Sequence, residues 1–413
     1  MTETAHAPTE YESPLAGLVV MKFGGTSVAD PEKIKRAAAR LVEAKSRGAR
    51  VVGVLSAMGH QTDELIRLAH EISPRPKPRA MDMLISIGER QTCALAEMAI
   101  HDLGHEAISL TGSQAGIVTD TEHGKAKIVE VRARRVHEAL DAGFIVLVAG
   151  FQGVSTDYEI TTLGRGGSDV TAVALAAAVG ADVCEIYTDV DGVFTADPRV
   201  VPEARKLHAV SFEEMLEMAA SGAKVLQLRS VEFARNHDVV LHVRSTFTDE
   251  HGTWVREEDE RMLEQAMISG VTHTTEEAVY EVHGVEPADL FEALAGASVN
   301  VDTVVQIGGD IVFSVPDEDR AATEDALAKI GGESSEVAEL GKVSVVGAGM
   351  RSHPGVAASA FGALRDLGIE PRFVSTSPIK ISFFVARDDV ERAVRHLHET
   401  FDLGDAAAER AHA

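Results

Sequence analysis

Two glycine-rich loops each carry a cationic side chain where an anion could bind. The first follows an apolar run and reads Lys22-Phe-Gly-Gly-Thr26. The second, Gly164-Arg-Gly-Gly-Ser-Asp169, comes directly before an apolar helical run. Glycines let backbone approach a ligand closely, and the N–H groups at the start of a helix bind anions. The lysine suits phosphoryl oxygens, and the arginine fork suits a carboxylate or phosphate held by two hydrogen bonds.

Each loop taken alone also has an ordinary structural interpretation. A Gly-Gly-Ser sequence before a helix is a common cap, in which Ser168 or Asp169 accepts hydrogen bonds from the first N–H groups. Lys22 alone is also compatible with a solvated lysine at the end of a strand, and no Gly-Lys-Ser/Thr completes a Walker A loop. Finding both loops in one α/β chain favours a site for anionic substrates.

Six motifs in order resemble the aspartate kinases, which belong to the amino-acid kinase superfamily. The resemblance covers about residues 18 to 400, and its closest match is the actinobacterial form with two C-terminal ACT domains. It implies ATP-dependent phosphorylation of the side-chain carboxylate of L-aspartate to 4-phospho-L-aspartate, the first step towards lysine, threonine and methionine. The motifs are Lys22–Val28, Ser56–Gly59, Thr62–Glu64, Gly88–Arg90, the Arg165 loop and Thr195–Arg199.

The resemblance assigns roles to the residues of the aspartate site. Lys22 would stabilise the transferring phosphoryl group, Arg165 would clamp the α-carboxylate and Glu89 would receive the α-ammonium. Asp169 would orient Lys22 or the substrate. Because the acceptor is already an anion, the reaction needs positioning and charge neutralisation rather than a strong base. The expected aspartate-binding residues are Ser56, Thr62, Asp63, Glu64, Glu89, Arg165, Gly166, Gly167 and Ser168.

The nucleotide is expected to bind at a strand end and along the turn that follows it. By resemblance, adenosine and ribose contact Thr188, Asp189, Phe194 and Arg199, and Lys224 lies near the phosphates. Mg²⁺ would arrive with ATP, held mostly by phosphates and water, with no dedicated metal ligands in the protein. The expected ATP-binding residues are Lys22, Phe23, Gly24, Gly25, Thr188, Asp189, Phe194, Thr195, Ala196, Asp197, Pro198, Arg199 and Lys224.

Alternatives stay open for some residues and for the function. Glu89 beside Arg90 is compatible with a surface ion pair, and Asp63 and Glu64 with first-turn carboxylates that favour the helix dipole. The chain is also compatible with a kinase of the same fold acting on another carboxylate or carbamate. A third possibility is a mainly regulatory, amino-acid-sensing subunit, against which the intact Lys22, Glu89 and Arg165 argue.

The two loops require an α/β scaffold. In the first half of the chain, segments with a helical pattern alternate with segments typical of buried strands, as such a scaffold demands. Helical stripes and short apolar runs follow one another, which predicts a largely parallel open sheet with helices on both faces. The resemblance identifies this sheet with the amino-acid kinase fold. Helices are expected over 31–47, 81–103, 125–142 and from Asp169, and strands over 51–55, 107–110, 144–149, 183–187 and, as the last one, 239–243.

Beyond residue 248 the chain becomes polar and then shows shorter elements in the order β-α-β-β-α, twice. This order predicts two tandem ferredoxin-like units, as in paired ACT domains. The expected organisation is a catalytic domain at 18–247, a linker at 248–266, ACT domains at 267–340 and 341–402, and flexible tails at 1–17 and 403–413.

Paired ACT domains bind amino acids, so the resemblance implies threonine and/or lysine as effectors. The second unit keeps the loop Pro354-Gly355-Val356, whereas the first places Glu286-Pro287 where the family has Pro-Gly. Glu370-Pro371 also replaces the usual Asn-Ile, so the sequence leaves the effector open. The expected effector-binding residues are Asn300, Asp302, Gln306, Val356, Ala357, Glu370, Pro371, Ser377 and Pro378.

Charge and composition restrict the partners. A formal net charge of −26 argues against a nucleic-acid or anionic-membrane surface. We find no apolar stretch of membrane-spanning length, and the first seventeen residues lack the apolar core of a signal peptide. Cys93 and Cys184 lie in apolar runs and are expected to be reduced. We therefore expect a cytoplasmic enzyme, either a homo-oligomer or an α/β assembly with an ACT-only subunit started internally at Met262.

Overall fold

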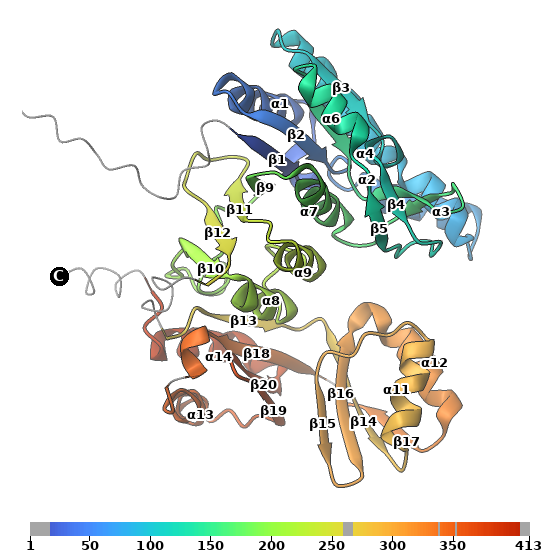
Figure 1. Cartoon of the computed structure of the whole chain (residues 1–413). Coiled ribbons are helices and arrows are strands. Elements are labelled where there is room, and N and C mark those ends of the chain that lie inside the picture. The colour runs from blue at the N-terminus through green and yellow to red at the C-terminus, as the bar shows by residue number, and fades with distance from the viewer. Residues whose placement is uncertain (1–16, 259–266, 338, 352, 405–413) are drawn as a thin grey trace, which may run out of the picture. The chain divides into compact units, whose positions relative to one another are not determined.

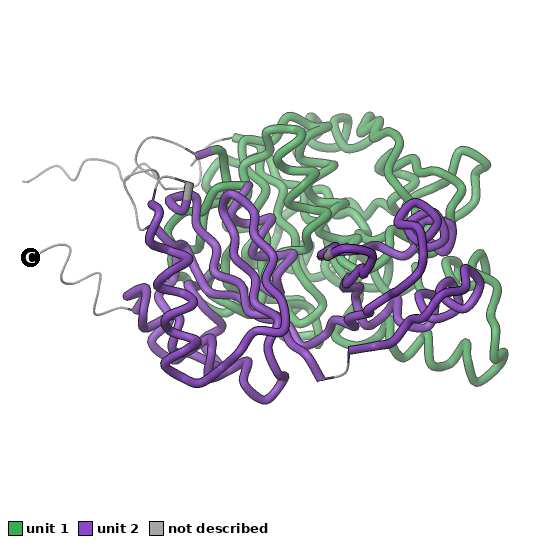
Figure 2. Tube along the Cα trace, turned by 90° about the horizontal axis from the view of Figure 1, so that it is seen from below, with its two compact units in different colours: residues 1–193, 208–212, 225–257 green, residues 194–207, 213–224, 258–413 purple. Residues whose placement is uncertain are grey.

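The structure is a computed structural model that describes residues 17–258, 267–337, 339–351 and 353–404 (Figure 1). The chain forms two compact units (Figure 2). The first comprises the chain up to Val193, His208–Phe212 and Val225–Glu257, and the second comprises Phe194–Leu207, Glu213–Lys224 and the remainder. Met262 and most of the expected tails lie outside the described residues.

The first unit is built on an eight-stranded sheet with the order β10-β12-β11-β9-β1-β2-β6-β3. The strands from β11 to β3 are parallel, whereas β12 runs antiparallel to β11 and β10 runs parallel to β12. The strands are β1 (Leu18–Phe23), β2 (Arg50–Leu55), β3 (Ala107–Leu110), β6 (Ile145–Ala149), β9 (Val183–Thr188), β10 (Ala209–Ser211), β11 (Leu241–Ser245) and β12 (Thr253–Arg256).

Helices cover both faces of this sheet, which confirms the predicted fold class. Helix α1 (Pro31–Ser46) begins at Asp30, whose side chain accepts a hydrogen bond from the Lys33 N–H. It shares an apolar core with α4 (Ile87–Asp102) and the central strands. Helices α6 (Arg134–Asp141) and α7 (Gly167–Val179) contact β6 and β1 respectively and lie on the other face (Figure 1). The remaining helices of the unit are α2 (Gln61–Ile72), α3 (Pro78–Ile85), α5 (Gly112–Ala115) and α9 (Leu228–Asn236).

A second, four-stranded sheet in the first unit was not predicted. Its order is β5-β4-β7-β8, and its strands are β4 (Ile117–Thr119), β5 (Ile128–Val131), β7 (Gln152–Ser155) and β8 (Ile160–Thr162). The helix predicted over 125–142 is therefore wrong in its first half, where the β-branched residues of β5 pair with β4.

Two other boundaries also differ from the prediction. The helix expected over 81–103 consists of two helices that meet at Ser86. The expected linker at 248–266 contains β12, so 239–243 does not hold the last strand of the sheet. Because β12 is short and flanked by charged residues, its apolar alternation is too brief to predict a strand.

The second unit contains two four-stranded antiparallel sheets, each with a β-α-β-β-α order as predicted. The first sheet, β15-β16-β14-β17, carries helices α11 (Pro287–Gly296) and α12 (Arg320–Ile330). The second, β13-β18-β20-β19, carries α13 (Val356–Asp366) and α14 (Val390–Thr400). The strands are β13 (Gly270–Thr274), β14 (Glu277–His283), β15 (Val304–Ile307), β16 (Asp310–Pro316), β17 (Glu333–Glu336), β18 (Leu340–Val346), β19 (Phe373–Ser377) and β20 (Lys380–Ala386).

Strand β13 belongs to the second of these sheets although it precedes the first in the chain. It pairs antiparallel with β18, with Gly270 opposite Val346. The boundary expected at residue 267 assigned this segment to the first ferredoxin-like unit. That whole unit is instead inserted between two neighbouring strands of the second sheet.

Parts of the expected catalytic segment also pack with the second sheet. In α8 (Phe212–Ala220), the Glu214 side chain accepts hydrogen bonds from the Ser269 hydroxyl and the Ala348 N–H. Thr195 is fully buried. The Leu403 carbonyl accepts a hydrogen bond from the Thr195 hydroxyl, and Leu403 is itself buried, so the start of the expected C-terminal tail is part of the packed unit.

Candidate active site

A cavity of about 270 Å³ in the first unit gathers most of the residues expected to bind aspartate. It lies where β1, β2 and β6 end, and the carboxyl ends of parallel strands are the usual ligand-binding edge of an α/β sheet. Its lining residues are Lys22, Gly25, Ser56, Ala57, Gly59, Thr62, Glu89, Phe151, Gly164, Arg165, Gly166, Gly167, Ser168, Asp169 and Gln227.

The two glycine loops meet in this cavity through an ion pair. The Lys22 Nζ atom lies 2.5 Å from Oδ1 of Asp169, and the two side chains are 11% and 9% exposed. Lys22 is near the end of β1, and Asp169 is in the first turn of α7. A buried carboxylate at this distance fixes the direction of the ammonium group, which supports the orienting role expected for Asp169.

The loop that carries Arg165 opens α7 without a side-chain cap. Gly166 is the N-cap residue, with φ at 71°, so the alternative interpretation of the loop, in which Ser168 or Asp169 caps the helix, is wrong. A Cβ atom at Gly166 would lie 2.2 Å from Cγ of Gln227, which leaves room for glycine alone. Because Asp169 points to Lys22 instead, the cavity receives both an exposed arginine and the N-terminal end of a helix.

Glu89 is a buried carboxylate whose second oxygen has no hydrogen-bond partner among the described residues. Its side chain is on α4 and the residue is 3% exposed. Burial raises the pKa of Glu89 to about 7, although N–H groups at Glu89 and Ala57 lower it in part. Arg90 instead donates to the Ser86 carbonyl and hydroxyl, so Glu89 is not half of a surface ion pair. A buried, under-satisfied carboxylate in a cavity suits a cationic ligand group.

Of the other residues expected to bind aspartate, some line the cavity and others do not. Ser56 directly follows β2 and Thr62 lies in the first turn of α2, and both line the cavity. Asp63 and Glu64 are exposed and are absent from the lining. Asp63 lies 3.4 Å from the His60 ring. Their position matches the alternative interpretation, in which first-turn carboxylates favour the helix dipole.

The first glycine loop offers fewer backbone donors than expected. The Gly24 N–H donates to the Tyr187 carbonyl at 3.2 Å, so this donor is already engaged. Phe23 is fully buried and stacks on Tyr187 with ring centroids 4.7 Å apart, which makes it a core residue. Gly25 does line the cavity, and a Cβ atom there would lie 3.1 Å from the carbonyl oxygens of Ala57 and Gly59.

Two cavity residues, Phe151 and Gln227, lie outside every predicted motif. Phe151 follows β6 and has a positive φ of 68°, which is uncommon for a residue other than glycine. Its place just after a predicted parallel strand was a usable signal, because such ends line ligand sites. Gln227 precedes α9 and is far from the other motifs in sequence, so no local pattern marks it.

The expected nucleotide-binding residues are divided between the two units. Thr188 and Asp189 lie at the end of β9 in the first unit, whereas Phe194–Arg199 and Lys224 belong to the second. There the Thr195 hydroxyl lies 2.9 Å from Nε2 of His398. Asp197 pairs with Arg199 at 2.7 Å and Lys224 with Glu276 at 2.5 Å, while Ala196 is buried and Pro198 exposed. Their role in binding ATP stays a prediction.

The expected effector-binding residues include two that already have strong partners. Asp302 lies 2.7 Å from Nζ of Lys342, whose fully buried side chain also pairs with Glu277. The Ser377 hydroxyl donates to Glu217 at 3.1 Å. Of the others, Asn300, Gln306, Ala357, Glu370 and Pro378 are exposed, Pro371 is half-buried and Val356 is buried.

Within the described part of the chain, we find no group of three or more His, Cys, Asp or Glu side chains arranged to hold a metal ion. Nor does any described helix have the length and apolar character to span a membrane. Cys93 and Cys184 are buried free cysteines, and burial raises the pKa of both thiols.

An open α/β sheet with a lysine and an arginine loop over its carboxyl edge defines a small-molecule phosphotransferase of the amino-acid kinase type. In agreement, the model of the amino acid kinase family matches residues 17–245, and an ACT domain model matches residues 343–401.

Individual relatives of known name identify the family within this superfamily. Aspartokinase from Mycolicibacterium smegmatis is 52% identical over 406 residues, covering 94% of this chain and 96% of that protein. Aspartokinase from Corynebacterium glutamicum is 50% identical with the same coverage. The crystal structure of E. coli aspartokinase III with aspartate and ADP superposes with a TM-score of 0.81 at 25% identity, covering 93% of this chain and 99% of that one. The chain belongs to the aspartokinase family, which confirms the resemblance.

Proposed function

We propose that this protein transfers the γ-phosphoryl group of ATP to the side-chain carboxylate of L-aspartate. The observation that carries this proposal is the buried Glu89 carboxylate, whose unpartnered oxygen shares a cavity with Arg165 and Lys22. Glu89 matches the α-ammonium of the acceptor, and Arg165 and Lys22 match its two carboxylates, while Asp169, the second carboxylate of the cavity, is already paired with Lys22. The product, 4-phospho-L-aspartate, is the first intermediate towards lysine, threonine and methionine.

The reaction follows from this arrangement. Arg165 holds the α-carboxylate and Glu89 the α-ammonium, so the side-chain carboxylate points towards Lys22. A carboxylate oxygen forms a bond to the γ-phosphorus as the bond from that phosphorus to the β,γ-bridging oxygen breaks, and ADP leaves. The oxygens of the transferring group carry the charge, and Lys22, held by Asp169, neutralises it. The nucleophile is already ionised, so no residue needs to remove a proton.

ATP is proposed as the phosphoryl donor, as supported by the ADP bound in E. coli aspartokinase III. Thr188 and Asp189, at the end of β9, are proposed to contact its sugar or base, and Phe194–Arg199 and Lys224 complete the proposed set. Mg²⁺ is proposed to enter with the nucleotide, where it screens the phosphate charge and is held mainly by phosphates and water.

Regulation by amino acids is proposed for the two ferredoxin-like units. E. coli aspartokinase III has also been solved with lysine and aspartate, with a TM-score of 0.72 and 25% identity to this chain. Lysine is therefore one proposed effector, and threonine is the other implied by the sequence resemblance. A homo-oligomer is proposed, and an α/β assembly with a subunit started at Met262 is its alternative.

An ADP-release assay with a panel of acids tests the proposed substrate. Aspartate should support release, whereas N-acetylaspartate, which has lost the ammonium, and succinate, which lacks the amino group, should not. Release with succinate or a carbamate at a rate equal to that with aspartate would show that Glu89 does not select an amino group. Absence of release with every acid would favour the regulatory-subunit alternative.

A further inference from the structure

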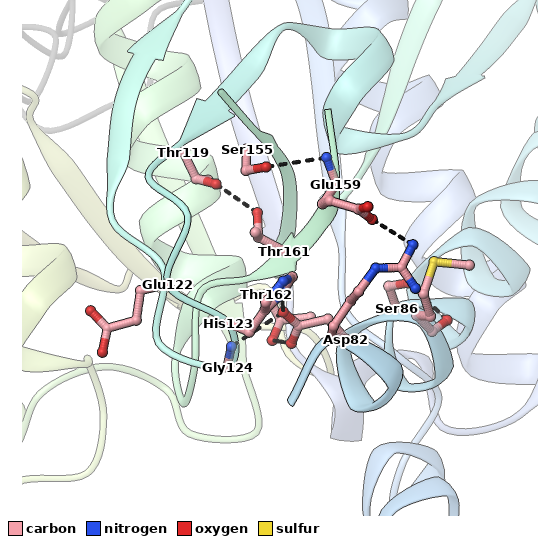
Figure 3. Close-up of polar contacts among 12 residues, drawn as sticks. Asp82, Ser86, Thr119, Glu122, His123, Gly124, Ser155, Glu159, Thr161 and Thr162 are labelled. Carbon is pink, nitrogen blue, oxygen red and sulfur yellow. Dashed lines mark hydrogen bonds and ion pairs between the residues drawn. The ribbon is translucent and has the colours of Figure 1, made fainter. Parts of the chain in front are cut away.

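A second buried carboxylate, Asp82 on α3, lies outside the cavity and is fully satisfied by hydrogen bonds (Figure 3). Its Oδ1 atom accepts from the Thr162 hydroxyl at 2.6 Å. Its Oδ2 atom lies 2.6 Å from Nδ1 of His123 and accepts from the Gly124 N–H at 3.2 Å. Asp82 is 0% exposed, and a carboxylate so deeply buried depends on all of these donors.

The Asp82 contacts anchor the segment that leads into the Arg165 loop. Thr162 is the last residue of β8, and Leu163 and Gly164 connect it to Arg165. The Thr162 carbonyl accepts from the Ala126 N–H at 3.0 Å, so the loop between β4 and β5 is attached at the same point. Arg165 itself stands between two glycines with positive φ, which provide little stiffness. Leu163 is also held, because its N–H donates to the Phe151 carbonyl at 2.9 Å and its carbonyl accepts from Arg229 at 2.8 Å. The rigid end of this loop is therefore Thr162 together with Leu163.

Asp82 also belongs to the segment that leads to Glu89. Helix α3 ends at Ile85, Ser86 follows, and α4 with Glu89 begins at once. The Ser86 carbonyl is held by Gln152 at 2.8 Å and by Arg90 at 3.0 Å. One carboxylate thus connects the helical segment before Glu89 to the strand before Arg165.

We propose that Asp82, through its hydrogen bond with Thr162, is a positioning residue that sets the separation between Arg165 and Glu89. The inference rests on the proposed function, in which these two groups hold the two ends of the amino-acid part of aspartate. A misplacement of about 1 Å in such a clamp can reduce the rate about a hundredfold. The nucleotide is proposed to bind other residues, so the expected effect is on the acceptor.

The test removes the Thr162 hydroxyl while keeping its shape, in the full-length enzyme. Thr162→Val should raise the KM for aspartate about tenfold or more and leave the KM for ATP within about twofold. Thr162→Ser should restore the KM for aspartate, because the hydroxyl returns. Thr161→Val is the matched control, because Thr161 is the neighbouring residue and is equally buried. This variant removes a 2.6 Å hydroxyl contact with Thr119 and leaves the hydrogen bond to Asp82 intact.

The KM for aspartate and the melting temperature together distinguish a positioning role from a purely structural one. If Thr162→Val and Thr161→Val lower the melting temperature alike and both leave the KM for aspartate unchanged, the proposal is overturned. If Thr162→Val does not fold, Thr162→Ala replaces it, because it also removes the hydroxyl that donates to Asp82. A folded Thr162→Ala variant with an unchanged KM for aspartate then overturns the proposal. A wild-type enzyme that does not phosphorylate aspartate refutes the proposed function, which is a different result.

Discussion

The Lys22 ammonium and the Asp169 carboxylate lie 2.5 Å apart, and both side chains are about nine-tenths buried. The pair joins the end of β1 to the first turn of α7, so each glycine loop fixes the position of the other. Breaking a buried pair by removing one partner costs about 3–5 kcal/mol, because the other charge is left uncompensated. A substitution of Lys22 therefore lowers both the free energy of unfolding and the catalytic rate, and a single variant cannot separate the two effects.

A pair of variants can separate the two effects. Lys22→Met should lower the unfolding free energy by about 3 kcal/mol and reduce kcat at least about a hundredfold. The double variant Lys22→Met/Asp169→Asn should recover most of the stability and none of the activity. Denaturant titration and steady-state kinetics measure both quantities. Recovery of turnover in the double variant would show that Lys22 acts only through the fold.

Arg165→Lys should mainly raise the KM for aspartate, because a point charge cannot reproduce two parallel hydrogen bonds. The KM for ATP should change much less, since the arginine is proposed to contact the acceptor alone. Kinetics with each substrate varied in turn provide the measurement. A rise confined to the KM for ATP would place the arginine on the nucleotide.

Glu89 makes stability depend on pH in a predictable direction. Because its pKa is raised from 4.5 to about 7, the folded state binds the proton more tightly than the unfolded state does. The stabilisation is fully present below pH 4.5 and is lost as the pH rises to 7. A Glu89→Gln variant does not titrate, so it should gain about 3 kcal/mol relative to the wild type across this range.

The control for this effect is Glu106→Gln, which removes an exposed carboxylate instead of a buried one. Thermal melts at several pH values provide the measurement. The same Glu89→Gln variant should lose affinity for aspartate at pH 8, because the amide cannot pair with an ammonium. Identical pH trends for Glu89→Gln and the wild type would show that Glu89 does not carry the raised pKa.

Gly166 and Gly180 form a matched pair at the two ends of α7. Both have positive φ, at 71° and 65°, but a Cβ atom meets Gln227 at Gly166 and nothing within 4 Å at Gly180. Gly180→Ala should therefore cost about 1 kcal/mol of stability and leave the kinetics unchanged. Gly166→Ala should cost more and raise the KM for aspartate, because the loop must move away from Gln227. Equal kinetics for the two variants would argue against a tight fit at Gly166.

Glu286 should weaken effector binding to the first ferredoxin-like unit. It is the N-cap residue of α11, it is exposed, and its carboxylate makes no capping hydrogen bond. Such a charge repels an effector carboxylate at the start of the helix. Inhibition by threonine and lysine, titrated singly and together, should be weaker than in relatives with Pro-Gly at this place, and Glu286→Gly should strengthen it. Strong concerted inhibition of the unmodified enzyme would contradict this.

Local signals were sufficient to locate the two cationic loops, because a glycine pair, a charged residue and an adjoining periodic run mark each loop in the sequence. They were insufficient where residues far away in the sequence determine the surroundings of a side chain. The surroundings of Glu89 come from burial by other segments, so the sequence alone left a surface ion pair open. Thr195 is expected by resemblance to bind the nucleotide, which stays a prediction, and no local pattern predicts the contact of its hydroxyl with His398, far along the chain.

Element boundaries failed for related reasons. Residues 125–142 show a helical pattern in part, but Ile128–Val131 pairs with β4 in a small sheet that only tertiary structure creates. Ser168 and Asp169 look like capping residues, but Asp169 is drawn into the ion pair with Lys22 and Gly166 takes the cap position. In both cases a long-range partner outweighed a local preference.

The pairing of β13 with β18 has a consequence for biosynthesis. A ribosome releases Gly270–Thr274 before the whole first ferredoxin-like unit, so β13 has no partner until Leu340–Val346 has also emerged. This non-local closure delays the second sheet during translation and leaves an unpaired edge exposed in the nascent chain. It also sets a lower limit for a viable shortened product: a chain starting at Met262 retains β13, whereas one starting after Thr274 would leave β18 as a permanent open edge, prone to self-association.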